Sequence, residues 1–586
     1  ITAGIDHWYQ PNGDSILALE EYQEHDWRLE ARLRVSEFRL PPDFRYKGQG
    51  KDNRNVKLTV PVLRFPRWCF CLFCKRLELS TLTMQQPVVC RDNKHKTWKY
   101  KPRMSQVPFV AICADGHLDD FPFDKWVHRA HRPSCAGTLR LKSLGGGGLE
   151  GQQVACDRCG KERSLRGITG ARFDNGEEHT TLSDQLSSPD DPYLCTGARP
   201  WLAQLEGICD QPMRGALRAA GNVYFPKVES SIYLPRTDGA VSAEIHDLMA
   251  NPAVGSTMRT LHGIFGAELD VTTLRTNLLK NVPPELFGPI SDEELIAGYR
   301  DLFGVGEEEP ESGEASDAEL LTGDDEWRYP EFQNIRETPK NDYLTATDPG
   351  VHADLASHLG RVRSVDVLRE TRALRGFTRV RDDVLKLSVG KALLRREPLL
   401  PMQDWLPAYV VKGEGIYFEL DPKRLEFWES SADVQKRVEK IIEQYSRAAT
   451  QRGLRPDRNL SPRFVMLHTL SHLLINELVF ACGYSSASLR ERLYVSTSSS
   501  REMAGVLIYT AAGDSEGTMG GLVRMARPEN LRSVFVSAIS DARWCSTDPV
   551  CMDAGEKGQG PDSCNLAACH GCALLPETSC EEFNRF

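Results

Sequence analysis

The sequence predicts a multidomain protein of mixed α/β (α+β) class, with zinc-ribbon-like modules in its N-terminal part and a zinc-binding α/β domain at its C-terminus. Three observations support this prediction: the length of 586 residues, the helix and strand patterns of the C-terminal half, and three Cys-x2-Cys pairs. At about 150 residues per domain, the length corresponds to about four domains. A composition of 40% hydrophobic and 26% charged residues is typical of globular proteins and excludes collagen-like and disordered chains.

The charge balance limits the partners that the whole surface can attract. The net charge is −10, from 72 Lys and Arg against 82 Asp and Glu. This balance excludes a uniformly basic nucleic-acid-binding surface, so DNA contacts are expected only in local patches. The N-terminal residues resemble no signal peptide, and no apolar run approaches the ~18 residues of a membrane span. We therefore expect a cytoplasmic protein that does not enter a membrane.

Shifts in composition divide the chain into regions. Residues 306–326 contain ten acidic residues and no basic residue, which predicts a solvated linker or loop; the alternative is an acidic mimic of nucleic acid that covers a basic surface. Residues 143–151 (SLGGGGLEG) predict a flexible connection. The expected regions are an N-terminal region with a zinc-ribbon-like module (1–142), a second zinc-binding region (152–300), an acidic linker or loop (301–330), a basic connecting region (331–420) and a C-terminal domain with a cysteine cluster (421–586).

The helices and strands of the C-terminal region are predicted from periodicity and end signals. Ser461 before Pro462 is an N-cap signal for a buried helix that continues from Phe464 to Ala481 and ends at Gly483. Residues 432–452 carry apolar side chains at steps of three and four, which predicts an amphipathic helix. Residues 505–510 (GVLIYT) predict a short strand, and together these elements indicate a mixed α/β domain.

The 17 cysteines favour metal binding over disulfide bonds, because a chain without a secretory signal is expected in a reducing compartment. Two thiolates in a Cys-x2-Cys pair reach one tetrahedral Zn²⁺ ion and leave two ligands to come from elsewhere. The pairs are Cys71/Cys74, Cys156/Cys159 and Cys569/Cys572. From them we predict two or three structural zinc ions and no catalytic residue.

The first pair has a third predicted ligand in Cys90, sixteen residues after Cys74. The fourth ligand stays open, because the next candidates in the chain are His95, Cys113 and His117. The alternative is that Cys69 and Cys71 are buried apolar residues without a metal.

The second pair, Cys156 and Cys159, is followed by Cys195 and Cys209. These four thiols are predicted to form a four-cysteine zinc site that closes the intervening loop, with Cys135 as a competing ligand.

The third pair belongs to the densest group, six cysteines near the C-terminus. Cys569, Cys572 and Cys580 are the predicted ligands, together with either Cys545 or Cys551. Cys564 is not needed for this site. A redox role requires a thioredoxin-like strand and helix around the pair, and none is apparent.

Several motifs resemble a known family. The stretches are HTLSHLL (468–474), GVLIYTAAGDSEGTMGGL (505–522) and CHGCALLPETSCEEFN (569–584), with ICADGHLDDFPFDKWVH (112–128) and GARPWL (197–202) upstream. They resemble the zinc-binding domain found C-terminal to MrfA-type repair helicases, in its stand-alone form in the DISARM anti-phage defence system. The resemblance implies a bacterial defence protein that forms a heterodimer with the superfamily-two helicase DrmA, alongside a methyltransferase and a phospholipase-D-like nuclease.

Enzyme motifs are largely missing from the sequence. It contains neither the G-x4-G-K-[ST] phosphate loop of a helicase motor nor the H-x-K-x4-D motif of phospholipase-D-type nucleases. His468 and His472 are interpreted as core histidines, because Thr469 stands where a zincin has Glu. His117, Asp119 and Asp120 give the alternative of a metal-dependent nuclease, although two adjacent carboxylates on an extended segment point to opposite faces.

Two basic segments are candidates for contacting DNA. In residues 91–103, basic side chains alternate with aromatic rings, a pattern that proteins use to bind single-stranded nucleic acid. The same alternation fits an exposed hairpin strand of the zinc ribbon equally well. The candidate DNA-binding residues are Lys94, Lys96, Trp98, Lys99, Tyr100, Lys101 and Arg103. Residues 360–396 contain nine arginines and two lysines, and are predicted to line a DNA groove, to form a solvated helical face or to contact a partner.

The sequence suggests a non-catalytic, zinc-containing DNA-binding protein that is the partner of a helicase. This protein is expected to help load or clamp DNA that has single-stranded regions or ends. The helicase is expected to supply the ATPase activity in trans. The alternatives are a metal-dependent nuclease and a purely structural zinc scaffold.

Overall fold

The structure is a computed structural model of the chain. It describes residues 1–10, 16–46, 54–145, 148–174, 177–234, 248, 252–266, 269–281, 283, 290–303, 324–400, 403–451, 456, 458–510, 520–558, 560 and 562–586. The predicted acidic segment and the DSEGTMGG turn (514–521) lie mostly outside the described residues, and so does part of the glycine-rich connection at 143–151.

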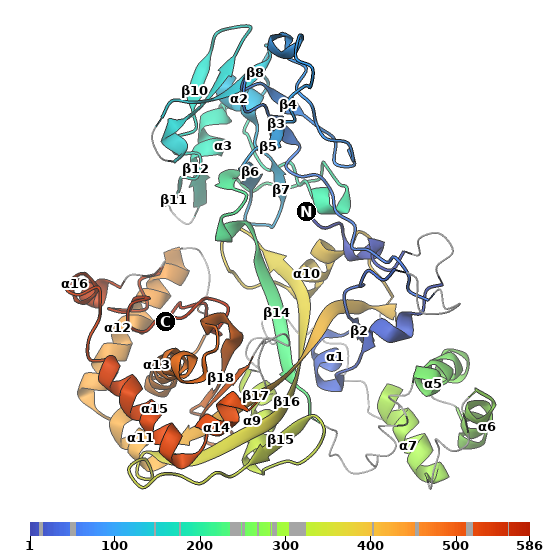
Figure 1. Ribbon diagram of the computed structural model, residues 1–586, viewed down its shortest axis with the longest axis vertical. Helices are drawn as coiled ribbons and strands as arrows, with labels where there is room; N and C mark the ends of the chain where they lie inside the picture. Colours follow the sequence, from blue (N-terminus) through green and yellow to red (C-terminus); the bar gives the residue numbers. More distant parts are fainter. Residues whose placement is uncertain are drawn as a thin grey trace.

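An N-terminal module of small antiparallel sheets forms the upper part of the molecule in Figure 1. Its core gathers Phe121, Phe123 and Trp126 against the surrounding strands. A module with such short strands has little apolar surface to bury, which is the setting in which metal ions commonly stabilise folds. Its elements are β3 (Trp68–Phe70), β4 (Leu77–Leu79), β5 (Ser105–Gln106), β6 (Phe109–Ile112), β7 (Leu118–Asp120), α2 (Phe123–His128), β8 (Leu139–Ser143), β9 (Gln152–Cys156), β10 (Glu162–Ser164), β11 (Ala171–Asp174), β12 (Glu177–Thr180), α3 (Thr181–Leu186) and β13 (Arg214–Leu217).

An eight-stranded sheet forms the centre of the lower part (Figure 1). β2 pairs in parallel with β17, which continues through β16 to β14 and also pairs with β19. The sheet therefore joins segments from both ends of the chain and extends across the predicted boundary at residue 421. Its strands are β1 (Gln23–Glu24), β2 (Glu37–Arg39), β14 (Phe225–Ile232), β15 (Leu344–Thr347), β16 (Leu359–Thr378), β17 (Trp405–Leu420), β18 (Leu489–Ser496) and β19 (Met503–Thr510).

Helices cover both faces of this sheet. Because side chains alternate along a strand, Ile416 and Phe418 pack into the core that contains α13, whereas Tyr417 packs on the opposite face against α9. The helices of the lower part are α1 (Trp27–Leu33), α9 (Asp324–Arg336), α10 (Leu387–Leu394), α11 (Pro422–Glu429), α12 (Ala432–Gln451), α13 (Pro462–Cys482), α14 (Gly521–Met525), α15 (Pro528–Asp541) and α16 (Val550–Ala554).

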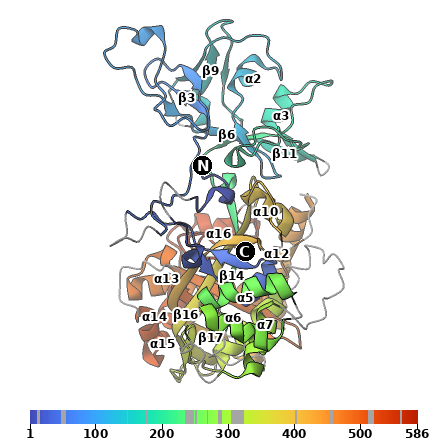
Figure 2. The ribbon, with the colours of Figure 1, turned by 90° about the vertical axis from the view of Figure 1, so that its right-hand side faces the viewer.

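Three further helices form a small unit with its own core, seen in front of the sheet in Figure 2. They are α5 (Pro252–Phe265), α6 (Val271–Asn281) and α7 (Asp292–Phe303). Leu274, Leu295 and Tyr299 are fully buried between them. The region predicted as 152–300 therefore contains both zinc-module strands and this helical unit.

The predicted C-terminal elements are confirmed. α13 begins after the Ser461 N-cap, whose hydroxyl accepts the N–H of Phe464, and ends at Gly483 in the left-handed conformation. α12 and β19 cover the other two predicted segments. The predicted linker differs from the structure at its end, because α9 begins at Asp324 and inserts Glu331 into the core.

α13 corrects the expectation that no apolar run approaches the length of a membrane span. This helix has 21 residues, and an 18-residue stretch of it has a mean hydropathy of 1.5, so it is long and apolar enough to cross a membrane by length and composition alone. In the structure it packs against α15 and β18, and the polar side chains of Ser471 and His472 are buried with it. These contacts are those of the central helix of a folded core.

Candidate metal centres and nucleic-acid surface

A tetrahedral zinc ion sets the distances expected between its ligand atoms. Zn–S bonds of about 2.3 Å and Zn–N bonds of about 2.0–2.1 Å place two sulfurs about 3.8 Å apart and a sulfur and a nitrogen about 3.5 Å apart. In each cluster described below, the donor atoms lie within 4.8 Å of one another.

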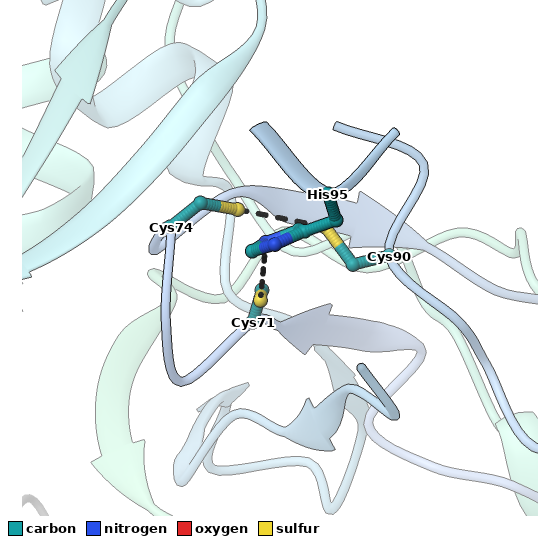
Figure 3. Close-up of side chains that lie close together, drawn as sticks. All are labelled: Cys71, Cys74, Cys90 and His95. Carbon is teal, nitrogen blue, oxygen red and sulfur yellow. Dashed lines mark hydrogen bonds between the residues drawn. The ribbon is translucent and has the colours of Figure 1, made fainter. Parts of the chain in front are cut away.

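The first cluster consists of Cys71, Cys74, Cys90 and His95, all buried (Figure 3). The turn between β3 and β4 carries Cys71 and Cys74, and the short 3-10 helix η3 (Asn93–His95) carries the histidine. Cys71 Sγ lies 3.5 Å from His95 Nε2, and Cys74 Sγ lies 3.5 Å from Cys90 Sγ. The open fourth position of the prediction is therefore filled by His95.

The second cluster consists of Cys113, His117, Cys195 and Cys209. The tight turn between β6 and β7 places Cys113 Sγ 3.4 Å from His117 Nδ1, and Gly116 at φ +82° makes this turn possible. The structure therefore differs from the predicted four-cysteine site, because Cys195 and Cys209 join this turn and not the Cys156/Cys159 pair.

The third cluster combines Cys156 and Cys159 with Cys135 and His128. Cys135 Sγ lies 3.7 Å from Cys156 Sγ, so the competing ligand of the prediction occupies the site. His128 Nδ1 lies 2.7 Å from the carbonyl oxygen of Asp124, which places the proton on Nδ1. Its Nε2 is buried without a hydrogen-bond partner among the described residues, as expected of a nitrogen that faces a metal ion.

The fourth cluster consists of Cys545, Cys551, Cys569 and Cys572. Cys545 Sγ lies 3.5 Å from Cys569 Sγ, and Cys551 Sγ lies 3.9 Å from Cys572 Sγ. The sequence left Cys545 and Cys551 as alternatives and added Cys580, but the structure brings in both and places Cys580 beside α13. Cys564 lies outside the cluster, and its thiol donates to the carbonyl oxygen of Asp562.

The first thiol of each Cys-x2-Cys pair is held in surroundings that favour the thiolate. Burial opposes ionisation of Cys71 and Cys156, but the backbone N–H groups that follow them lower both pKa values, that of Cys156 to about 6. A hydrogen bond from Thr547 lowers the pKa of Cys569 to about 6. The thiolate is the form that binds zinc, so all three pairs fit a metal ion.

Comparison with known proteins adds independent support. A family model described as a domain of unknown function (DUF8724) matches residues 1–225, and the model of the MrfA Zn-binding domain matches residues 470–573. The DISARM protein DrmB of Bacillus paralicheniformis is 29% identical over 600 aligned positions, which cover 99% of this chain and 94% of that protein. The chain is similar to this DISARM protein along nearly its whole length.

The matched zinc-binding domain contains all four thiols of the fourth cluster. The expected zinc cofactor is therefore supported by a family model and by side-chain geometry together. The structure contains four such clusters, whereas two or three zinc ions were predicted. The number is higher because histidines complete sites for which the sequence offered too few neighbouring cysteines.

The candidate DNA-binding segment is an exposed loop. Residues 94, 96, 98–101 and 103 are exposed, with η3 at the start of the segment, so the alternative of a regular hairpin strand is wrong. Trp98 packs edge-on against His95 with ring centroids 4.5 Å apart, whereas Tyr100 is 77% exposed and lies beneath the ammonium group of Lys99. The first cluster fixes this loop, because His95 belongs to the loop and Cys90 directly precedes it.

The second basic segment is largely neutralised inside the fold. Most of its arginines belong to β16 or follow it, and they contact acidic side chains or backbone carbonyls. These contacts are Arg361–Glu419, Arg363–Asp348, Arg369–Glu24, Arg372–Glu370, Arg375–Glu229, Arg379–Gly116, Arg381–Glu178 and Arg395–Asp404. The arrangement does not favour the predicted DNA groove.

The three residues of the nuclease alternative are engaged separately. His117 joins the second cluster, Asp119 accepts a hydrogen bond from Thr196, and Asp120 pairs with Arg67 at 2.6 Å. Asp119 and Asp120 are adjacent on β7 and point to opposite faces, as expected. The geometry brings no pair of these carboxylates to one metal ion.

Sequence reasoning did not assign His128 to a metal site, and it left His95 and His117 as candidates. A signal for two of them is present, since His117 follows Cys113 by four residues and His95 follows Cys90 by five. His128 follows Asp124 at one helical turn but precedes its partner Cys156 by 28 residues, so spacing does not reveal it.

Proposed function

We propose that this protein is a non-catalytic, zinc-stabilised DNA-binding subunit that acts with a superfamily-two helicase in bacterial anti-phage defence. The observation that carries the proposal is the similarity to DISARM protein DrmB along 99% of the chain. Such coverage includes the N-terminal module, the central sheet and the C-terminal cluster alike. We place the protein in the bacterial cytoplasm, where a defence protein meets invading DNA.

The metal centres support a structural role for zinc in this function. Each cluster supplies four protein donors, which leaves no coordination position for water or substrate. The zinc ions would hold the short strands of the N-terminal module and the C-terminal segment in place. Catalysis, in this proposal, belongs to the helicase partner, which supplies the phosphate loop that this sequence lacks.

DNA contact is assigned to the loop at residues 91–103. Its lysines are exposed and its Tyr100 ring is open to solvent, the combination that serves phosphate contact and base stacking on single strands. The helicase contact is assigned to the zinc-binding domain. Trp544, Val550 and Met552 lie beside the fourth cluster, and each is at least 70% exposed.

Coexpression with a superfamily-two helicase of the DrmA type tests the proposal. We expect one peak in size-exclusion chromatography, with an interface of the ~2,000 Å² class typical of permanent assemblies. Trp544→Ser combined with Met552→Ser is expected to weaken the complex, while Phe427→Ser, at an 83% exposed position outside the matched domain, leaves it intact. Separate elution at micromolar concentration, or ATP hydrolysis by this chain alone, contradicts the proposal.

A further inference from the structure

A fifth group of ligating side chains lies inside the C-terminal core, apart from the four clusters above. His468 and His472 on α13 face Glu491 of β18 and Cys580 of the C-terminal segment. His468 Nε2 lies 3.1 Å from Cys580 Sγ and 3.3 Å from Glu491 Oε1, and His472 Nε2 lies 3.4 Å from the same oxygen. None of the four side chains is more than 5% exposed. The sequence interpretation of His468 and His472 as ordinary core histidines does not account for this convergence.

The tautomer of a neutral His472 is set by its other neighbour. Its Nδ1 lies 2.9 Å from the carbonyl oxygen of Ala573, which can only accept, so Nδ1 carries a proton. A neutral His472 then points the lone pair of Nε2 at the carboxylate of Glu491. This nitrogen has no hydrogen-bond partner within the described part of the chain. Two facing acceptors in a buried site require a cation between them.

The other two donors are held as metal ligands usually are. Glu491 accepts the hydroxyl of Ser471 on Oε2 and the N–H of Glu581 on Oε1. Cys580 Sγ accepts the backbone N–H groups of Glu582 and Asn584, each at 3.3 Å. Such outer hydrogen bonds orient first ligands and stabilise a thiolate.

The same backbone feature recurs at two of the clusters described above. The N–H two residues after the thiol donates to Sγ at Cys195 and Cys569, at 3.3 and 3.2 Å, as it does at Cys580. Cys580 thus shares local geometry with cysteines of groups that fit zinc, although it belongs to no Cys-x2-Cys pair.

The distances between the donor atoms fit a bound metal ion. A charge-assisted hydrogen bond between imidazolium and carboxylate is typically about 2.7–2.9 Å long. The two nitrogen–oxygen distances of 3.3 and 3.4 Å equal the edge of about 3.3–3.4 Å that a tetrahedral zinc ion imposes on N and O ligands. The nitrogen–sulfur distance is shorter than the corresponding edge, so Sγ is expected to move outward by about 0.4 Å on binding.

We propose that His468, His472, Glu491 and Cys580 bind a structural Zn²⁺ ion. Two imidazoles, one carboxylate and one thiolate are a donor set that suits zinc, and the two negative charges balance the ion. Because the site is closed to solvent and has four protein ligands, it offers no position for catalysis. The ion fastens the C-terminal segment to α13 and β18.

This site is separate from the one that the comparisons assign. The matched zinc-binding domain covers residues 470–573, which include the fourth cluster but neither His468 nor Cys580. The inference uses only these side chains and does not depend on the proposed function.

Anomalous diffraction at the zinc edge tests the proposal on the wild-type chain, in its helicase complex if that crystallises better. The expected result is a difference peak among the four donor atoms that disappears below the edge. The fourth cluster is an internal positive control. A peak at that cluster with none between His472 and Glu491 overturns the proposal.

Metal content gives a second test. Cys580→Ser and Glu491→Gln should each lose one zinc equivalent per chain relative to the wild type, measured by elemental analysis after dialysis. Cys482→Ser is the matched control, since Cys482 lies on the same helix and belongs to none of these groups. Equal zinc content in Cys580→Ser and Cys482→Ser overturns the proposal, and the diffraction test decides the case where a variant does not fold.

Discussion

Arg492 donates to both carboxylate oxygens of Glu331, at 2.7 and 2.8 Å, and neither side chain is exposed to solvent. Arg28 contacts the same carboxylate at 3.1 Å. Burial opposes ionisation of Glu331, but the two guanidinium groups lower its pKa below the ordinary value. One buried carboxylate thereby joins α1, α9 and β18, which come from the N-terminal, central and C-terminal parts of the sequence.

We predict that Glu331→Gln destabilises the fold strongly, by about 3–5 kcal/mol, because it leaves buried guanidinium groups without a counter-charge. The measurement is the midpoint of urea denaturation. Glu326→Gln on the same helix is the control, since its pair with Arg501 is exposed and is expected to contribute at most about 1 kcal/mol. Equal midpoints for the two variants would show that the buried charge is not essential.

A second prediction concerns the fourth cluster. The purified chain should carry at least four zinc ions, and Cys569→Ser should lose one of them and reduce soluble yield, because metal binding and folding are coupled at such sites. Elemental analysis measures the zinc content per chain of the wild type and of the variant. Cys564→Ser, at a buried thiol outside the cluster, should keep the full zinc content, and a wild-type value below one zinc per chain would remove the basis for these centres.

A third prediction concerns DNA. Replacing Lys94, Lys96, Lys99 and Lys101 by Ala should weaken single-strand binding and flatten the slope of log K against log salt by roughly 0.7 per lost phosphate contact. Fluorescence anisotropy at several salt concentrations measures this slope. Four exposed cations elsewhere serve as the control in a second quadruple variant: Lys423, Arg424, Lys436 and Arg437. If both quadruple variants show the same DNA affinity and the same salt slope, the loop has no special role in DNA binding.

Base stacking in this loop is better tested at Tyr100 than at Trp98. Trp98 lies against His95, so its removal disturbs the first cluster as well as any stacked base. Tyr100→Ala should cost about 1–3 kcal/mol of binding free energy if a base stacks there. Zinc content measured on the same sample confirms that the cluster stays intact.

A fourth prediction concerns pH. Burial raises the pKa of Asp26, the N-cap of α1, from 3.8 to about 6, and its Oδ2 has no hydrogen-bond partner among described residues. The folded state therefore binds this proton more tightly than the unfolded chain. The resulting stabilisation is complete below about pH 3.8 and is lost as the pH rises through about 6.

Asp26→Asn removes this titration and keeps an oxygen that caps Leu29. The melting temperature of the variant relative to the wild type should consequently be higher at pH 8 than at pH 5. A difference that does not change with pH would show that Asp26 ionises normally in the fold.

Local signals in the sequence predicted the elements that depend on nearby residues. The cap at Ser461, the stop at Gly483 and the apolar period of α12 each operate within a few residues, and all three elements are present. The knuckles at Cys71, Cys156 and Cys569 are similarly local, and the metal-binding geometry of each is found at the predicted pair.

The assignment of partners between distant segments could not be predicted in this way. The prediction placed Cys195 in one site with Cys156 because Cys195 is the next cysteine of the chain after that pair. In the structure, the turn at Gly116 brings Cys113 close to Cys195 instead. The arginines of β16 were expected to form a surface, yet their counter-charges come from residues such as Glu24 and Glu229, far away in sequence. Long-range pairing depends on the sheet order, which periodicity does not encode.

The parallel pairing of β2 with β17 has a consequence for biosynthesis. Residues 37–39 pair with residues 23–24 on one edge but find their other neighbour only at residues 405–407, so this strand emerges from the ribosome long before its second partner exists. Until then the backbone donors and acceptors on the edge of β2 that faces β17 are unpaired, and a nascent chain with such an open edge is prone to aggregation. Folding of the central sheet must therefore await most of the polypeptide, and N-terminal fragments that stop short of residue 405 should depend on chaperones to stay in solution.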